Sequence, residues 1–133
     1  MRTIKGFDSC YEITYSKNGE FLLGNISWGT YGGPTKTILS IKDTTFIKKV
    51  SSSGCSKDLK KYISLGWNNS IKCYSTEKPS NEGLIWEAEN TNGKAKVADF
   101  SSDDKKVAVG FENSTISIYD ADTGQLLQTV GQL

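Results

Sequence analysis

The chain has 133 residues, a length that predicts one domain with a core of its own. Its 16 basic and 15 acidic side chains nearly cancel, which argues against a bulk nucleic-acid binder and a polybasic membrane-surface protein. The chain contains no histidine, so Ser-His-Asp catalysis, Cys-His catalysis and zinc sites built on imidazole are excluded. No apolar run approaches the ~18 residues of a membrane span, and the N-terminal residues show no apolar stretch typical of a secretory signal.

The cysteines indicate a reducing compartment. Cys10, Cys55 and Cys73 are an odd number without paired spacing, so a disulfide framework is not expected. Cys73 alternates with Ile71 in the segment IKCYS, which predicts a small buried side chain rather than a reactive thiol. These observations favour a cytoplasmic protein.

Taken in chain order, the predicted elements are short strands separated by turns. β-Branched or aromatic side chains occupy alternate positions in residues 11–16, 37–43, 70–75 and 115–120. Clusters of turn-forming residues lie at residues 16–19, 68–70, 101–104 and 120–124. No segment follows the 3.6-residue period of a helix. The chain is therefore predicted to be all-β, as a sandwich, a barrel or a propeller.

An internal repeat favours the propeller. Gly24, Gly66 and Gly110 each follow an apolar residue, and they are spaced 42 and 44 residues apart. Ser16 and Ser102 open similar turns ahead of the first and third of these glycines, and the middle copy is two residues longer. A unit of turn, strand, tight turn and strand that recurs every ~40–45 residues is typical of propeller blades.

The third copy, residues 97–130, resembles a WD repeat over its full length. Tyr119 and Asp120 stand where the family has the Trp-Asp pair, and residues 121–130 resemble the turn and outer strand that follow. The first copy resembles the start of a WD repeat, with Phe7 in place of the usual histidine and residues 41–43 at the pair. The second copy, residues 53–90, is the most divergent. No copy keeps the histidine or the tryptophan, so the family's usual buried hydrogen-bond network is not expected.

The repeat and the resemblance together predict about three four-stranded antiparallel sheets in one propeller segment, residues 1–133. The expected blades are approximately residues 2–49, 50–92 and 93–131. Because propeller rings close with about four to eight blades, three blades make a partial propeller or one completed by oligomerisation. Three alternatives follow: part of a longer propeller, a pair of identical chains, or completion of a partner's open propeller. Apolar segments typical of outer strands at both ends favour the first.

The sequence shows no arrangement of residues typical of a catalytic site. Asp103 and Asp104 are adjacent in a hairpin turn, which points their carboxylates apart. Residues 120–124 lack the third carboxylate of a calcium loop, and Gly131 stands where its closing glutamate would be. Ser56 and the nearby lysines form no positioned nucleophile pair. We therefore predict no catalytic residues, no metal site and no cofactor; the chain is not expected to be an enzyme.

The resemblance implies a partner-binding face, where loops entering the inner strand meet turns between the second and third strands. The residues it would gather there are Phe7, Asp8, Trp28, Tyr31, Asn68, Glu112 and Asn113. Residues 25–36 form an inserted loop, and its two aromatic side chains are of the kind that dominates binding hot spots.

A second candidate surface is basic. Lys57, Lys60 and Lys61 fall at a turn between a first and a second strand, within a lysine-rich stretch. Such a patch suits an acidic protein surface, a phosphate backbone or anionic lipid. Interleaved aspartates favour an ordinary solvated turn instead.

The function that the resemblance implies is a non-catalytic scaffold that binds other proteins, itself or a further propeller segment, in the cytoplasm or on the cytoskeleton. Neither membrane nor nucleic acid is an expected partner. The alternative is an oligomeric lectin-type propeller that stacks sugars on Trp28, Trp67 and Trp86. A support domain for chemistry elsewhere in a longer chain is a third alternative.

Overall fold

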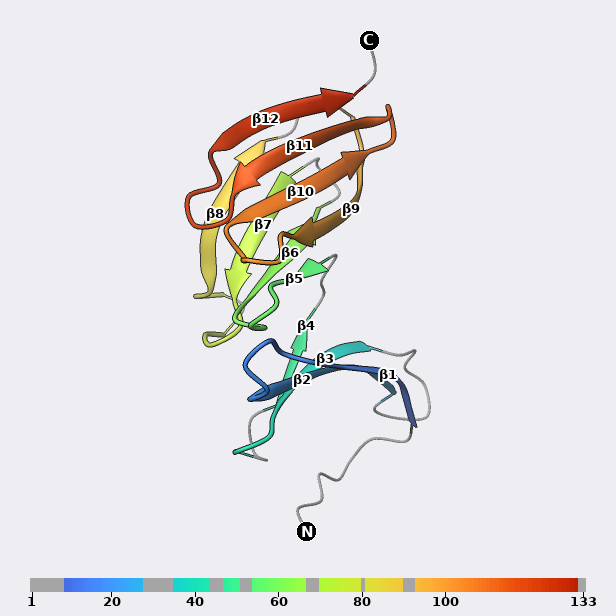
Figure 1. Cartoon of the computed structure of the whole chain (residues 1–133), viewed down its shortest axis with the longest axis vertical. Coiled ribbons are helices and arrows are strands. Elements are labelled where there is room, and N and C mark those ends of the chain that lie inside the picture. The colour runs from blue at the N-terminus through green and yellow to red at the C-terminus, as the bar shows by residue number, and fades with distance from the viewer. Residues whose placement is uncertain are drawn as a thin grey trace. The chain divides into compact units, whose positions relative to one another are not determined.

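The computed structural model describes residues 9–27, 35–43, 47–50, 54–66, 70–79, 81–89 and 93–131 (Figure 1). Within these ranges every regular element is a β-strand, which confirms the all-β prediction. The described residues contain no helix long and apolar enough to cross a lipid bilayer. The chain divides into two compact units, Met1–Ser51 and Ser52–Leu133, which are described separately below.

The first unit contains one four-stranded antiparallel sheet, the first sheet. Its strands follow one another in the order β1-β2-β3-β4. They are β1 (Ser9–Tyr15), β2 (Phe21–Ser27), β3 (Thr35–Ser40) and β4 (Ile47–Val50). Ile26 and Ile38 are fully buried, as expected where apolar residues recur with a period of two.

The second unit contains two more four-stranded antiparallel sheets, each again in chain order (Figure 1). The second sheet consists of β5 (Gly54–Cys55), β6 (Lys61–Leu65), β7 (Ser70–Ser75) and β8 (Leu84–Glu89). The third sheet consists of β9 (Ala95–Phe100), β10 (Lys106–Phe111), β11 (Thr115–Asp120) and β12 (Leu126–Gly131). Three sheets of this construction are the propeller blades that the repeat predicts.

In all three sheets, the same type of turn joins the first strand to the second. It starts with Ser16, Ser56 and Ser101, whose hydroxyls each accept the N–H of the residue five positions later at 3.0 Å. Each hydroxyl also donates at 2.6 Å to a side-chain oxygen two positions later, on Asn18, Asp58 and Asp103. The serine of the third copy is therefore Ser101, one residue before the Ser102 that the spacing to Gly110 indicates.

The fourth residue of this turn has a left-handed backbone in every sheet. It is Gly19, Leu59 or Asp104, with φ of 74°, 60° and 60°. A leucine rarely adopts this conformation, and a non-glycine residue there costs about 1–2 kcal/mol. The hydrogen-bonded serine turn imposes the conformation regardless of the residue. Register is thus set by the turn and not by the strand glycines.

The same register corrects the position of the Trp-Asp pair in the first copy. Asp120 lies opposite Lys106, Ser75 opposite Lys61, and Ser40 opposite Phe21. The pair in the first sheet is therefore Leu39-Ser40, and the expectation of residues 41–43 was wrong. The second residue of the pair has the same physical role in all three sheets. Its side-chain oxygen accepts a hydrogen bond from a backbone N–H of the turn that follows. The bonds are Asp43 N to Ser40 Oγ at 3.0 Å, Glu77 N to Ser75 Oγ at 3.2 Å and Asp122 N to Asp120 Oδ1 at 2.9 Å.

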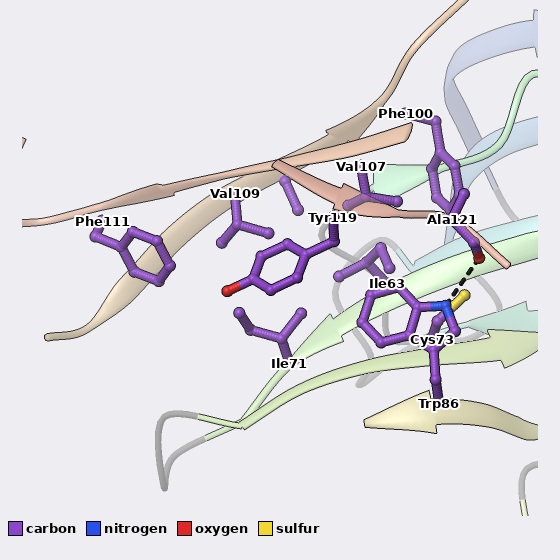
Figure 2. Close-up of a cluster of buried hydrophobic side chains, with 11 residues drawn as sticks. Ile63, Ile71, Cys73, Trp86, Phe100, Val107, Val109, Phe111, Tyr119 and Ala121 are labelled. Carbon is purple, nitrogen blue, oxygen red and sulfur yellow. Dashed lines mark hydrogen bonds between the residues drawn. The ribbon is translucent and has the colours of Figure 1, made fainter. Parts of the chain in front are cut away.

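The core of the second unit lies between the second and third sheets (Figure 2). From the second sheet, it contains Ile63, Ile71, Cys73 and Trp86. From the third sheet, it contains Ala98, Phe100, Val107, Val109, Phe111, Tyr119 and Ala121. The predicted burial of Cys73 is confirmed. Burial raises the pKa of the Cys73 thiol to about 11, and the nearby Lys61 opposes this shift only in part.

Candidate protein-interaction surfaces

The junction between the second and third sheets is polar on the side where the serine turns lie. Strand β9 packs against β5 and β6. One carboxylate of the third sheet, Asp104, accepts the backbone N–H groups of Lys57 at 2.6 Å and Asp58 at 3.1 Å. Asp103 instead bonds within its own turn, to Ser101 and Lys105. The two adjacent acids therefore point apart as predicted, but Asp104 is not a solvated turn residue, because it holds the two sheets together.

The core face of the same junction is anchored by Trp86. Its indole Nε1 donates a hydrogen bond of 2.8 Å to the carbonyl oxygen of Ala121, as the dashed line in Figure 2 marks. The indole also stacks on Tyr119 at a centroid distance of 6.1 Å. Gly124, with φ of 76°, lies so close that an added Cβ would stand 2.6 Å from the ring. A tryptophan buried by protein on both faces cannot stack on a sugar, so the lectin alternative is wrong for Trp86. Trp28 and Trp67 lie outside the described residues.

The predicted basic patch contains two ion pairs that link the second and third sheets. The Lys57 ammonium lies 3.2 Å from Asp99, and the Lys61 ammonium pairs with Asp122. Lys60 is exposed, and it makes no ion pair with any described residue. The geometry thus brings the three lysines to one turn but compensates the charge of two of them.

The predicted partner-binding residues lie mostly outside the described ranges. This holds for Phe7, Asp8, Trp28, Tyr31 and Asn68. The other two, which are exposed, sit together on the β10–β11 turn: Glu112 and Asn113.

The β10–β11 turn is built by Asn113. Its Oδ1 accepts the N–H of Thr115 at 3.1 Å and the hydroxyl of the same residue at 2.6 Å. The backbone N–H of Glu112 donates to the carbonyl oxygen of Lys94 at 2.9 Å. Asn113 thus shapes the turn through its Oδ1, and the side chain of Glu112 beside it is exposed.

Two acids of the third sheet's turns, Asp120 and Asp103, serve local structure. The Asp120 carboxylate accepts the N–H groups of Asp122 and Thr123, and these hydrogen bonds lower its pKa. Hydrogen bonds from Ser101 and Lys105 likewise lower the pKa of Asp103. No group of three or more acids and cysteines in the described residues is arranged to hold a metal ion.

One surface that the sequence analysis missed is apolar. On the third sheet, Val97, Ile116 and Val130 are exposed. On strand β1 of the first sheet, Tyr11, Ile13 and Tyr15 are exposed on alternate positions. Period-two alternation places Ile13 and Tyr15 on one face of β1, and the ladder pairs place Val97, Ile116 and Val130 on one face of the third sheet.

Comparisons with known proteins agree with the repeat-based reading. The chain is 36% identical, over 55 residues, to eukaryotic translation initiation factor 3 subunit I from the yeast Lodderomyces elongisporus. The matched stretch covers 41% of this chain and 16% of that protein, so the chain spans well under two thirds of its relative. No family model matches the chain. The similarity is consistent with a WD-repeat propeller.

Proposed function

We propose that this chain is a non-catalytic propeller segment that holds other proteins together. The observation that carries the proposal is twofold: the chain forms four-stranded sheets like propeller blades, and it matches a protein named as a subunit of translation initiation factor 3. Rigid sheets that share one turn and one register offer loops at fixed positions, which is what a scaffold requires. The same match supports a cytoplasmic location and gives no support to a cytoskeletal one.

The binding surface proposed for partners is the face that carries the β10–β11 turn. We assign to it Phe7, Asp8, Trp28, Tyr31, Asn68, Glu112 and Asn113. The basic turn of Lys57, Lys60 and Lys61 is the secondary surface. Blades at residues 2–49, 50–92 and 93–131 remain the proposed division of the chain. Completion of the ring, by further sheets or by another chain, is part of the same proposal.

A binding measurement tests the function and distinguishes the two surfaces. The probe is translation initiation factor 3 from Lodderomyces elongisporus, prepared without its subunit I and immobilised. We expect saturable binding of the chain, weakened at least about tenfold by Glu112→Lys, since the loss of a hot-spot contact costs about 2 kcal/mol or more. Glu82→Lys, the same substitution at an exposed glutamate between β7 and β8 and outside both proposed surfaces, is the matched control and is expected to leave the affinity within about twofold.

Two results would contradict the proposal. The first is the absence of binding by a chain whose circular dichroism shows folded β-sheet. The second is binding that Lys60→Glu weakens and Glu112→Lys does not, because this would place the partner on the basic turn.

A further inference from the structure

The serine turn of the first sheet differs from its two counterparts by one amide. Two residues after the turn serine, the first sheet has Asn18, whereas the second and third sheets have Asp58 and Asp103. In all three turns the Oδ1 atom at this position accepts the serine hydroxyl at 2.6 Å and a backbone N–H two residues further on, at 2.9–3.0 Å. The turn therefore uses one side-chain oxygen, which an amide and a carboxylate both supply.

The charge of a neighbouring side chain suits the amide in the first turn and the carboxylate in the others. In the second and third turns the residue two positions after the aspartate is a lysine, Lys60 or Lys105. In the first turn it is Glu20, whose Oε2 accepts a hydrogen bond of 3.3 Å from the Nδ2 of Asn18. A carboxylate at position 18 would lose this donor and would stand beside a like charge. The first turn is thus built for asparagine.

Asn18 is followed by Gly19, and this pair is open to attack by its own backbone. Both residues are exposed, and Gly19 has no Cβ to hinder the approach of its nitrogen to the amide carbon of Asn18. In the attack, the Gly19 N–H gives up its proton, its nitrogen bonds to Cγ, and the Cγ–Nδ2 bond breaks with release of ammonia. Water then opens the succinimide ring. Cleavage between nitrogen and Cγ yields aspartate, and cleavage between nitrogen and the main-chain carbonyl carbon yields isoaspartate.

The folded turn opposes this reaction. The N–H of Gly19 donates to the carbonyl oxygen of Ser16 at 2.9 Å, so this bond must break before the nitrogen can lose its proton. The side-chain amide of Asn18 is also held at both of its ends, by the Ser16 hydroxyl and by the backbone and carboxylate of Glu20. The attack therefore requires the turn to open, and its rate follows the fraction of chains in which the turn is open.

We propose that Asn18 is a site of spontaneous deamidation, and that opening of the serine turn in the first sheet sets the rate. The aspartate product keeps the backbone and the bonds of Oδ1, but it faces Glu20. The isoaspartate product adds a carbon atom to the main chain between Ser16 and Phe21. The Ser16 hydroxyl can then no longer hold both position 18 and the N–H of Phe21. Deamidation thus marks chains whose turn has opened, and its isoaspartate product prevents the turn from closing in its original form.

Mass spectrometry of the purified 133-residue chain tests the proposal. The chain is incubated in neutral buffer, either folded or in concentrated urea, and the peptide that contains Asn18 is followed for conversion of amide to acid. We expect conversion in urea, and conversion at least about tenfold slower in the folded chain. Ser16→Ala removes the hydroxyl that holds the amide oxygen, so it should raise the folded-state rate several-fold and leave the rate in urea unchanged. Ser101→Ala, the same change in the turn of the third sheet, is the matched control and should alter neither rate.

A further variant tests the attacking atom. Gly19→Leu introduces the residue that the second sheet has at this position, Leu59 with φ of 60°. The added side chain crowds the nitrogen, so Asn18 should stay largely intact even in urea. Loss of the amide from this variant as fast as from the wild type in urea overturns the proposal.

Three other results would overturn it as well. They are an Asn18 that stays intact in urea, an equal rate in the folded chain and in urea, and equal folded-state rates for Ser16→Ala and Ser101→Ala. Circular dichroism distinguishes variants that keep their β-sheet from those that do not. None of these results bears on the binding of other proteins through Glu112.

Discussion

Replacement of Trp86 by alanine is expected to lower the free energy of unfolding of the second unit by about 3–5 kcal/mol. The indole fills the space between the sheets against the Tyr119 ring and Gly124, and its removal leaves a cavity that the close-packed surroundings fill only in part. The carbonyl oxygen of Ala121 also loses its indole donor while remaining buried. Small domains are stable by only about 5–15 kcal/mol, so the variant should unfold at a much lower urea concentration.

Two further variants separate the parts of the Trp86 effect. Trp86→Phe keeps most of the ring and removes the indole N–H, so a loss of about 1–3 kcal/mol is expected. Ile85→Ala is the control, since this neighbour on β8 is 40% exposed and such positions change stability by about 0.5 kcal/mol. Urea unfolding followed by far-ultraviolet circular dichroism suits the series, because it does not depend on tryptophan emission. Equal stabilities of Trp86→Ala and Ile85→Ala would show that the sheets do not stack through this residue.

The second large effect is expected for Gly54→Ala, at about 1–3 kcal/mol or more. A Cβ at Gly54 would lie 2.4 Å from the carbonyl oxygen of Ala98 and 3.2 Å from the Cα of Asp99. Both atoms belong to the backbone of β9, which cannot rotate away as a side chain does. The third sheet must therefore move off the second, which lengthens the bonds from Lys57 and Asp58 to Asp104.

Gly110→Ala is the matched control for this substitution. Its Cβ would meet only the Cγ2 of Val97, at 3.1 Å, and that exposed side chain can turn aside. We expect a change within about 0.5–1 kcal/mol, partly offset by the reduced entropy of the unfolded chain. Thermal unfolding of the two variants in parallel measures the difference. If Gly54→Ala lowers the free energy of unfolding no more than Gly110→Ala does, β5 and β9 do not approach each other as closely as described here.

Strand positions were predictable because period-two alternation is a local property. The segment IKCYS shows this, since the alternation alone predicts the burial of Cys73. Register was not predictable from the strands. A glycine after an apolar residue recurs in each copy, but the distance from the turn serine varies, so counting from the glycine selected Ser102 instead of Ser101. The hydrogen bonds of the turn set the strand register. In the sequence, only a serine with Asn or Asp two residues later indicates these bonds.

The contacts between sheets were even less accessible to sequence reasoning. Trp86 lies on a strand with apolar residues on both faces, so alternation does not say which face meets the next sheet. Asp104 looks like any solvated turn acid until the turn of the second sheet is placed beside it. Both residues act across long sequence separations, which no local pattern encodes. The same applies to Lys57 and Lys61, whose acidic partners lie on the third sheet.

The central claim is that the second and third sheets stack face to face, and hydrogen exchange at the Trp86 indole tests it most directly. In a ¹H–¹⁵N spectrum, the signal is assigned by its absence in Trp86→Phe. The account predicts that the Nε1–H exchanges with deuterium only as the second unit unfolds, as slowly as the central amides of β6 and β7. Exchange at the rate of an exposed indole, while those amides remain protected, would contradict it, because the sheets would then form without stacking.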